Sequence, residues 1–223
     1  MKNKNQKKRE LKAAVLGVGN MGTAITFAMN KLGFEVVGVD ANESSVNNFR
    51  KYISGPDGVF YHTDQNNADR SMERALLFEK PDVVISSLPY HQTQEIALWC
   101  IDNEFRYCDL GGRVDVSKEI NEWAKKDAVK PVFTDLGLAP GWVNILAEEG
   151  YKKLYGSGEV INVEMMVGGL PDYLESNKNP LRYALTWSID GLINEYKDDC
   201  LVLQGGETEL VGGMTGLEVV ETK

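Results

Sequence analysis

The stretch AAVLGVGNMGTAI, residues 13–25, joins a short β-rich run to a helical pattern through three glycines in G-x-G-x-x-G spacing. Gly17 permits a tight turn after the strand, Gly19 lets a pyrophosphate approach the backbone, and Gly22 lets the helix pack closely on the strand. The N-terminus of the helix offers unpaired N–H groups and a positive dipole end to phosphates. The pattern predicts a dinucleotide-binding turn. The alternative is a turn that requires glycine only for its shape.

Asp40 ends the next β-rich run, about 20 residues beyond the turn, where a carboxylate would bind the hydroxyls of the adenosine ribose. No arginine directly follows Asp40, so a 2′-phosphate would meet negative charge there. The sequence therefore predicts NAD as the cofactor in preference to NADP. Asn20 and Met21, at the start of the helix, are expected to contact the cofactor together with the glycines.

Short β-rich runs continue to alternate with helical patterns as far as about Asn144. The predicted strands are Ala13–Leu16, Glu35–Val39, Val59–His62, Val83–Ser86, Arg106–Asp109 and Pro131–Thr134. Apolar residues recur at helical spacing between them: Ile25, Ala28, Met29 and Leu32; Ile96, Trp99 and Cys100; Ile120, Trp123 and Ala124. This alternation predicts a doubly wound parallel sheet, the Rossmann fold, with Trp99 and Trp123 in its core.

The pattern changes after about Gly156. EVINVEMMV (159–167) alternates as a half-buried antiparallel strand does, and LVLQGGETELV (201–211) places a glycine pair between two strand-like runs, as in a hairpin. LRYALTWSIDGLINEY (181–196) is typical of a helix. We expect a basic tail over 1–10, a Rossmann domain over 11–150 and a partial α+β domain over 151–223.

Composition narrows the classes of partner. The 223 residues carry a net charge of −9, which argues against nucleic acid or an anionic membrane. The three cysteines form no CxxC pair, which predicts free thiols and no metal site. The basic start MKNKNQKKRE is followed by no apolar segment, and no apolar run reaches about 20 residues. We therefore expect a cytoplasmic protein without a signal peptide.

Three predicted strands are followed by segments that carry polar side chains, two of them with glycines: SSLPYHQ (86–92), DLGGRVD (109–115) and TDLGLAPGWVN (134–144). Ligands of open α/β sheets bind at the carboxyl ends of strands. His91 is a candidate general base; alternatively, it packs at a helix start or binds a ribose or phosphate. Asp109 and Asp135 steer an amine or the nicotinamide carboxamide, or else cap loops. Arg113 binds a substrate carboxylate or forms a surface ion pair.

Several stretches resemble the saccharopine dehydrogenase family, and within it the NAD-dependent lysine 6-dehydrogenase type. They are VLGVGNMGTAI, VVISSLPYHQ, DLGGRVD, DLGLAPGWVNILA, VGGLP and NPLRYALTWSIDGLINEY. The resemblance runs from about Leu11 to Val220. It implies a Rossmann domain that holds the dinucleotide and an α+β domain that closes over the substrate and mediates dimerisation, giving a homodimer.

The resemblance also implies roles for individual residues. The nicotinamide side would be bordered by Leu88, Pro89, His91, Asp109, Gly111 and Gly112. The junction with substrate would be lined by Pro140, Gly141 and Asn144, and the second domain would supply Arg182, Trp187, Ser188 and Tyr196. His91, Asp109, Asp135 and Asn144 are the catalytic candidates, and Arg113 and Arg182 would hold carboxylates.

The resulting hypothesis is an oxidoreductase that moves hydride from a carbon bearing an amine nitrogen to NAD, with a small amino acid or amine as substrate. Members of the family continue beyond the segment that corresponds to GLEVVETK (216–223), so the second domain is expected to be incomplete. That expectation favours one alternative, a non-catalytic NAD-binding protein or subunit. A sugar-type oxidoreductase with a similar two-domain plan is the other.

Overall fold

The computed structural model describes residues 11–53, 57–63, 70–156 and 188–216, with isolated positions between 158 and 180. The chain divides into two compact units, residues 1–165 and 166–223. The predicted basic tail lies outside the described residues. Within them, no helix combines the length and the apolar character that a membrane span requires.

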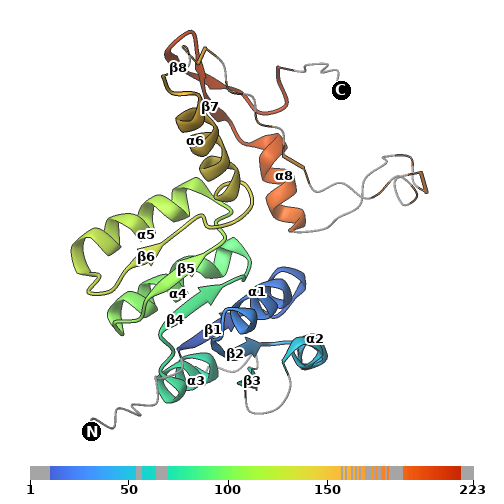
Figure 1. Cartoon of the computed structure of the whole chain (residues 1–223), viewed down its shortest axis with the longest axis vertical. Helices are drawn as coiled ribbons and strands as arrows, with labels where there is room; N and C mark the ends of the chain where they lie inside the picture. Colours follow the sequence, from blue (N-terminus) through green and yellow to red (C-terminus); the bar gives the residue numbers. More distant parts are fainter. Residues whose placement is uncertain are drawn as a thin grey trace, which may run out of the picture. The chain divides into compact units, whose positions relative to one another are not determined.

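The first unit is built on a six-stranded parallel sheet (Figure 1). Its strands are β1 (Lys12–Leu16), β2 (Glu35–Asp40), β3 (Gly58–His62), β4 (Val83–Ser86), β5 (Tyr107–Asp109) and β6 (Val132–Phe133). They lie in the order β3-β2-β1-β4-β5-β6, the strand order of a Rossmann fold, with its reversal point between β1 and β4. The predicted doubly wound sheet is confirmed.

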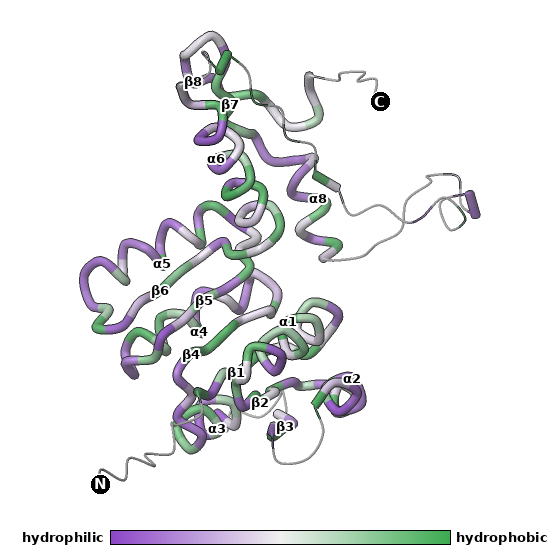
Figure 2. The backbone as a smooth tube through the Cα atoms, in the orientation of Figure 1, coloured by the Kyte–Doolittle hydropathy of each residue, from purple (hydrophilic) through white to green (hydrophobic). Residues whose placement is uncertain are grey.

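Helices cover both faces of this sheet. They are α1 (Asn20–Lys31), α2 (Ser45–Tyr52), α3 (Ser71–Glu79), α4 (Tyr90–Asp102) and α5 (Val114–Asp127). A further helix, α6 (Trp142–Leu154), follows β6 and has no buried residue. Val15 and Val36 pack with Phe49 of α2 and side chains of α1, whereas Leu16 and Val37 pack with side chains of α3, α4 and α5. Since neighbouring strand residues point to opposite faces, strands buried on both sides need continuous apolar runs, and β1 and β4 show them (Figure 2).

The prediction of Trp123 as a core residue is wrong, and Leu32, a member of the apolar pattern of the first helix, is also exposed. Leu32 caps the end of α1 and is 72% exposed, because the helix turns Gly22 and Thr26 toward the sheet. Trp123 is 48% exposed; α5 lies near the edge strand β6 and buries only Ser117 and Ile120. The apolar periodicity therefore identified these helices: in α1, Ile25 and Met29 pack on the core, whereas Leu32 lies beyond the last helical turn.

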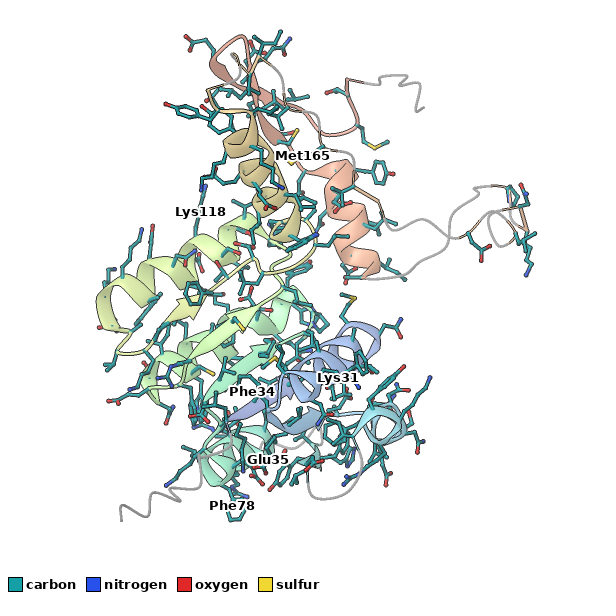
Figure 3. All side chains as sticks on the ribbon, viewed as in Figure 1. Lys31, Phe34, Glu35, Phe78, Lys118 and Met165 are labelled. Carbon is teal, nitrogen blue, oxygen red and sulfur yellow. The ribbon has the colours of Figure 1, made fainter. Side chains whose placement is uncertain are left out.

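Charged side chains tie the first unit together at the start of β1. Lys12 Nζ lies 2.6 Å from Glu79 Oε2 and 3.2 Å from Oε1 of Glu35, the first residue of β2, which Figure 3 labels. The hydroxyl of Tyr61 donates to Glu79 Oε1 at 2.6 Å. Burial raises the pKa of Glu79, but the hydrogen bonds from Lys12 and Tyr61 outweigh it and the net shift is downward. The Glu79 carboxylate therefore links the end of α3 to β1 and β3.

The second unit contains α8 (Ile189–Lys197) and a hairpin of β7 (Cys200–Gln204) and β8 (Glu207–Val211). Gly205 and Gly206 form its turn with φ of +60° and +86°, the backbone that a two-residue hairpin turn requires. The predicted hairpin is confirmed, and α8 confirms the described part of the predicted helix.

The strand predicted over EVINVEMMV is not found at its described positions. Ile161, Val163, Met165 and Val167 have no strand assignment and are 45–91% exposed. A half-buried strand needs a neighbouring strand to bond with, and none of the described residues supplies one.

Candidate functional site

The turn between β1 and α1 has a backbone that only glycine fits at two of its three glycine positions. Gly17 has φ of +80°, and a Cβ there would lie 2.9 Å from Leu88 Cδ2 and 3.2 Å from Ser87 O. A Cβ on Gly22 would lie 1.7 Å from the carbonyl oxygen of Gly17. Helix α1 therefore packs directly onto the turn, which explains the first and third glycines of the motif by sterics within the protein.

Gly19 is different, because a Cβ there would meet nothing within 4 Å. It is the N-cap of α1, and no side chain caps the helix. The N–H groups of the first helical residues, Asn20 and Met21 among them, have no acceptor within a helix, and both side chains are exposed. An open backbone in front of uncapped N–H groups is a fitting place for a pyrophosphate.

Asp40, at the end of β2, holds the turn through its carboxylate. Oδ2 accepts the N–H of Val18 at 2.5 Å, and Oδ1 accepts the N–H of Asn42 at 2.7 Å. The backbone of Gly17 adds a bond to Val39 O at 2.8 Å. A carboxylate oxygen has two lone pairs, so each oxygen of Asp40 retains capacity for a ribose hydroxyl.

A cavity of about 480 Å³ opens beside Asp40, at the carboxyl ends of β1, β2 and β3. Its volume falls within the range of about 300–1,000 Å³ typical of small-molecule sites. Its walls come from the strand ends, the start of α3 and one face of α4. The lining residues are Leu16, Gly17, Val39, Asp40, Ala41, Thr63, Arg70, Ser71, Met72, Glu73, Leu88, Gln92, Glu95, Ile96 and Trp99.

The sequence did not predict most of the polar residues that line the cavity, and it predicted only a core position for Trp99. Gln92, Glu95, Ile96 and Trp99 follow i, i+3, i+4, i+7 spacing, which marks one face of α4. Trp99 stacks on Phe105, with ring centroids 5.6 Å apart, and also lines the cavity. The helical period could have identified this face as a unit. Thr63 and Arg70 gave no such signal, since they lie in irregular backbone.

Asp109 lies at the end of β5 and is only 3% exposed. Its Oδ1 accepts the N–H of Gly111 at 2.9 Å and that of Asp135 at 3.0 Å. Burial raises the pKa of Asp109, and the two backbone donors only partly oppose this effect. These contacts join the loop after β5 to the loop after β6. They match the second of the two roles predicted for Asp109, which is to cap a loop.

The packing of the segment after β6 explains why two glycines, Gly137 and Gly141, precede α6. A Cβ on Gly137 would lie 2.6 Å from Leu110 O, and one on Gly141 would lie 2.3 Å from Gly137 O. Gly141 also has φ of +127°, and the preceding Ala139–Pro140 peptide is cis. Both glycines are therefore required by backbone packed against backbone.

Asp135 and Asn144 anchor this segment. Asp135 has φ of +62°, and its Oδ1 accepts the hydroxyl of Ser117 at 2.8 Å. Asn144 Oδ1 accepts the N–H of Gly141 at 3.0 Å, while the N–H of Asn144 donates to Gly141 O at 3.1 Å. The two bonds of Asn144 cap the start of α6, and the bond from Ser117 holds Asp135. Both side chains therefore make contacts that stabilise the loop.

Of the residues predicted in the loop after β4, Leu88 is among those that line the cavity, and Pro89 and His91 are not. Pro89 is the N-cap of α4, Leu88 lines the cavity, and His91 is exposed on the first turn of α4, with Nε2 3.3 Å from Gln92 Nε2. Arg113 pairs with Asp115 through two 2.9 Å bonds and lies over the Tyr90 ring at 5.7 Å. Arg113 therefore forms the surface ion pair that was one of its two predicted roles, with Asp115 as the partner.

The candidates of the second unit are only partly described. Arg182 and Trp187 lie outside the described residues. Ser188 caps α8, accepting the N–H of Gly191 at 3.2 Å, and Tyr196 is 61% exposed. The thiols of Cys100, Cys108 and Cys200 are free, and burial raises the pKa of Cys100 to about 12, which disfavours the reactive thiolate. No group of metal ligands forms among the residues that the structure describes.

Comparisons with known proteins agree with this geometry. The chain matches the saccharopine dehydrogenase NADP binding domain over residues 13–130 and the saccharopine dehydrogenase C-terminal domain over residues 137–219. It is 35% identical over 146 residues to the mitochondrial alpha-aminoadipic semialdehyde synthase of Rattus norvegicus, covering 65% of this chain and 16% of that protein. The Bos taurus protein of the same name is 30% identical over 213 residues, covering 94% and 22%.

Among solved structures, apo saccharopine dehydrogenase (L-Glu forming) from Saccharomyces cerevisiae superposes with a TM-score of 0.63 at 19% identity, over 91% of this chain and 44% of that one. That likeness establishes the fold. The chain thus spans about a fifth of the curated relatives that it matches. The match of the dinucleotide-binding model to more than half of the chain, together with the turn and strand order that carry it, shows that the chain belongs to the saccharopine dehydrogenase family.

Proposed function

We propose that the first unit binds a nicotinamide dinucleotide across the carboxyl edge of its sheet and serves an oxidoreductase that acts on a carbon–nitrogen centre of an amino acid. The observation that carries the proposal is the turn: Gly19 faces open space, α1 begins uncapped, and Asp40 lies within hydrogen-bond distance of the turn. The pyrophosphate would bind at the start of α1, and the adenosine would fill the adjoining cavity.

We assign NAD as the preferred dinucleotide. Asp40 presents a carboxylate where the adenosine ribose hydroxyls would bind, and Glu73 and Glu95 add carboxylates to the same cavity. A 2′-phosphate would meet this negative charge. The opposing consideration is Arg70, which lines the cavity at the start of α3, and the family model is described as binding NADP. NADP is therefore the second candidate.

Calorimetry decides between the two dinucleotides. Wild-type protein and Asp40→Ala are titrated with each one. Tighter binding of NAD than of NADP by the wild type, reduced or reversed by Asp40→Ala, supports the assignment. Tighter binding of NADP by the wild type overturns it, and Arg70→Ala then tests whether that arginine recognises the phosphate.

For the chemistry, the bound nicotinamide would accept a hydride from the carbon that bears the amine nitrogen, leaving an imine that water hydrolyses. The chain would contribute orientation and proton handling. His91 is the proton-handling candidate whose side chain is exposed, on the first turn of α4. Asp109 is buried and Asn144 is engaged in the cap of α6, so we expect them to act by holding the loops around the reacting centre.

The activity is tested by following dinucleotide reduction with a panel of saccharopine, lysine and polyamine derivatives. Turnover with one of these amines supports the amino-acid oxidoreductase. Binding of dinucleotide without turnover supports the rival, a non-catalytic dinucleotide-binding protein. The matches to both the binding-domain and C-terminal-domain models favour the enzyme. A homodimer, implied by the family resemblance, is a further proposal that light scattering tests.

A further inference from the structure

The peptide unit between Gly17 and Val18 is held at both of its ends by side chains from neighbouring strand ends. Ser87 Oγ donates to the carbonyl oxygen of Gly17 at 2.5 Å, and the N–H of Val18 donates to Asp40 Oδ2 at 2.5 Å. The carbonyl and the N–H belong to one planar group. That plane cannot rotate without breaking one bond or both.

Ser87 is itself well placed for this contact. Its backbone N–H donates to Leu16 O at 2.9 Å, which extends the pairing of β4 with β1 up to the turn. Its hydroxyl also lies 3.2 Å from Leu16 O. The next peptide along the turn leads to Gly19 and the uncapped start of α1. The orientation of the Gly17–Val18 peptide therefore sets the direction in which the following N–H groups point.

The two bonds form a chain with one polarity: hydroxyl to carbonyl, then amide N–H to carboxylate. Hydrogen bonds aligned in this way polarise and strengthen one another. The chain ends at Asp40, the residue proposed to bind the ribose. The turn and the ribose acceptor are thus fixed relative to each other before any ligand arrives, which lowers the ordering cost of binding.

We propose that Ser87 is a positioning residue for dinucleotide binding, which orients the Gly17–Val18 peptide and through it the N–H groups that receive the pyrophosphate. This inference rests on the proposed function of the turn. Ser87 makes no contact with the ligand in this scheme. It acts through the backbone of the turn.

The experiment compares Ser87→Ala with the matched control Ser86→Ala. Ser86, the last residue of β4, is buried, and its hydroxyl makes no hydrogen bond to the turn, so its removal should leave binding unchanged. Loss of the Ser87 bond should weaken both NAD and ADP-ribose about three- to tenfold, the range expected for one neutral hydrogen bond. The two ligands should weaken equally, because the turn contacts the part they share.

The Val18 amide provides a readout without ligand. Its NMR signal should shift in Ser87→Ala and stay in place in Ser86→Ala, because only the first change frees the peptide. Unchanged affinity in Ser87→Ala, or an equal loss in both variants, would overturn the inference while wild-type binding leaves the proposed function standing. A wild-type chain that binds neither ligand would overturn the proposed function and this inference together.

Discussion

Gly19 and Gly22 stand three residues apart in one motif, and the structure predicts opposite consequences for replacing them. In Gly22→Ala the new Cβ would begin 1.7 Å from Gly17 O and would have to reach at least 3.0 Å. Helix α1 or the turn must then move by more than 1 Å, and the obstacle is backbone rather than a flexible side chain. We expect the upper end of overpacking costs, about 3 kcal/mol, which corresponds to a melting temperature lower by about 6–12 °C.

Gly19→Val introduces a larger side chain, yet its first carbon meets nothing within 4 Å. The expected stability cost is that of an apolar N-cap, about 1 kcal/mol or about 2–4 °C. The side chain would occupy the space in front of the α1 N–H groups. Losing even one charge-assisted bond to a pyrophosphate costs about 2 kcal/mol, or roughly thirtyfold in affinity.

The assay is thermal melting together with NAD calorimetry on wild type, Gly19→Val and Gly22→Ala. The reasoning predicts that the bulkier substitution costs little stability and weakens NAD binding, whereas the smaller one strongly destabilises the fold. Wild-type NAD affinity in Gly19→Val would show that the turn binds no pyrophosphate. A wild-type melting temperature in Gly22→Ala would refute the packing argument.

Three further predictions concern anchoring contacts. Asn144→Ala should lower the free energy of unfolding by about 1 kcal/mol through loss of the α6 cap; a kcat reduced more than about tenfold at an unchanged melting temperature would instead give Asn144 a substrate role. The lowered pKa of Glu79 supplies stability that is complete above its ordinary pKa and lost as pH falls through the lowered one, so urea titrations of Glu79→Gln should lack that acid-side loss. The raised pKa of Asp109 has the opposite effect on stability: as pH falls through the raised pKa, the free energy of unfolding of the wild type should rise relative to that of Asp109→Asn. A difference in unfolding free energy that stays constant across that pH range, measured by urea titration, would contradict this prediction.

The sequence predicted the doubly wound sheet because the signals it used are local. Gly17 after a strand, Gly33 after a helix and the 3.6-residue period of the helices are signals that depend only on neighbouring residues. The observed strand order is consistent with right-handed crossovers. The hairpin over 200–211 was predictable for the same reason, since Gly205 and Gly206 suit a turn with two positive φ values.

Predictions failed where the outcome depended on a distant partner. The alternation of residues 159–167 indicates a strand only if another strand lies beside it, and the local sequence does not identify that neighbouring strand. The exposure of Trp123 depends on how close α5 lies to the edge of the sheet. The lining of the cavity combines residues of α3 and α4 with three strand ends, so no single segment of the sequence could predict it.

The candidate residues at the rim show why chemistry-bearing side chains at strand ends are ambiguous. Each loop that leaves the carboxyl end of a parallel strand exposes backbone N–H groups that require acceptors, and a carboxylate or amide in that loop is the nearest one. Asp40, Asp109 and Asn144 all accept backbone N–H groups in this way. The Asp40 bond holds the turn that precedes the uncapped start of α1, whereas the Asp109 and Asn144 bonds hold the loops after β5 and β6. Substitutions at the anchoring side chains should therefore change stability and binding together, and Gly19 is the position where binding can be changed with little effect on the fold.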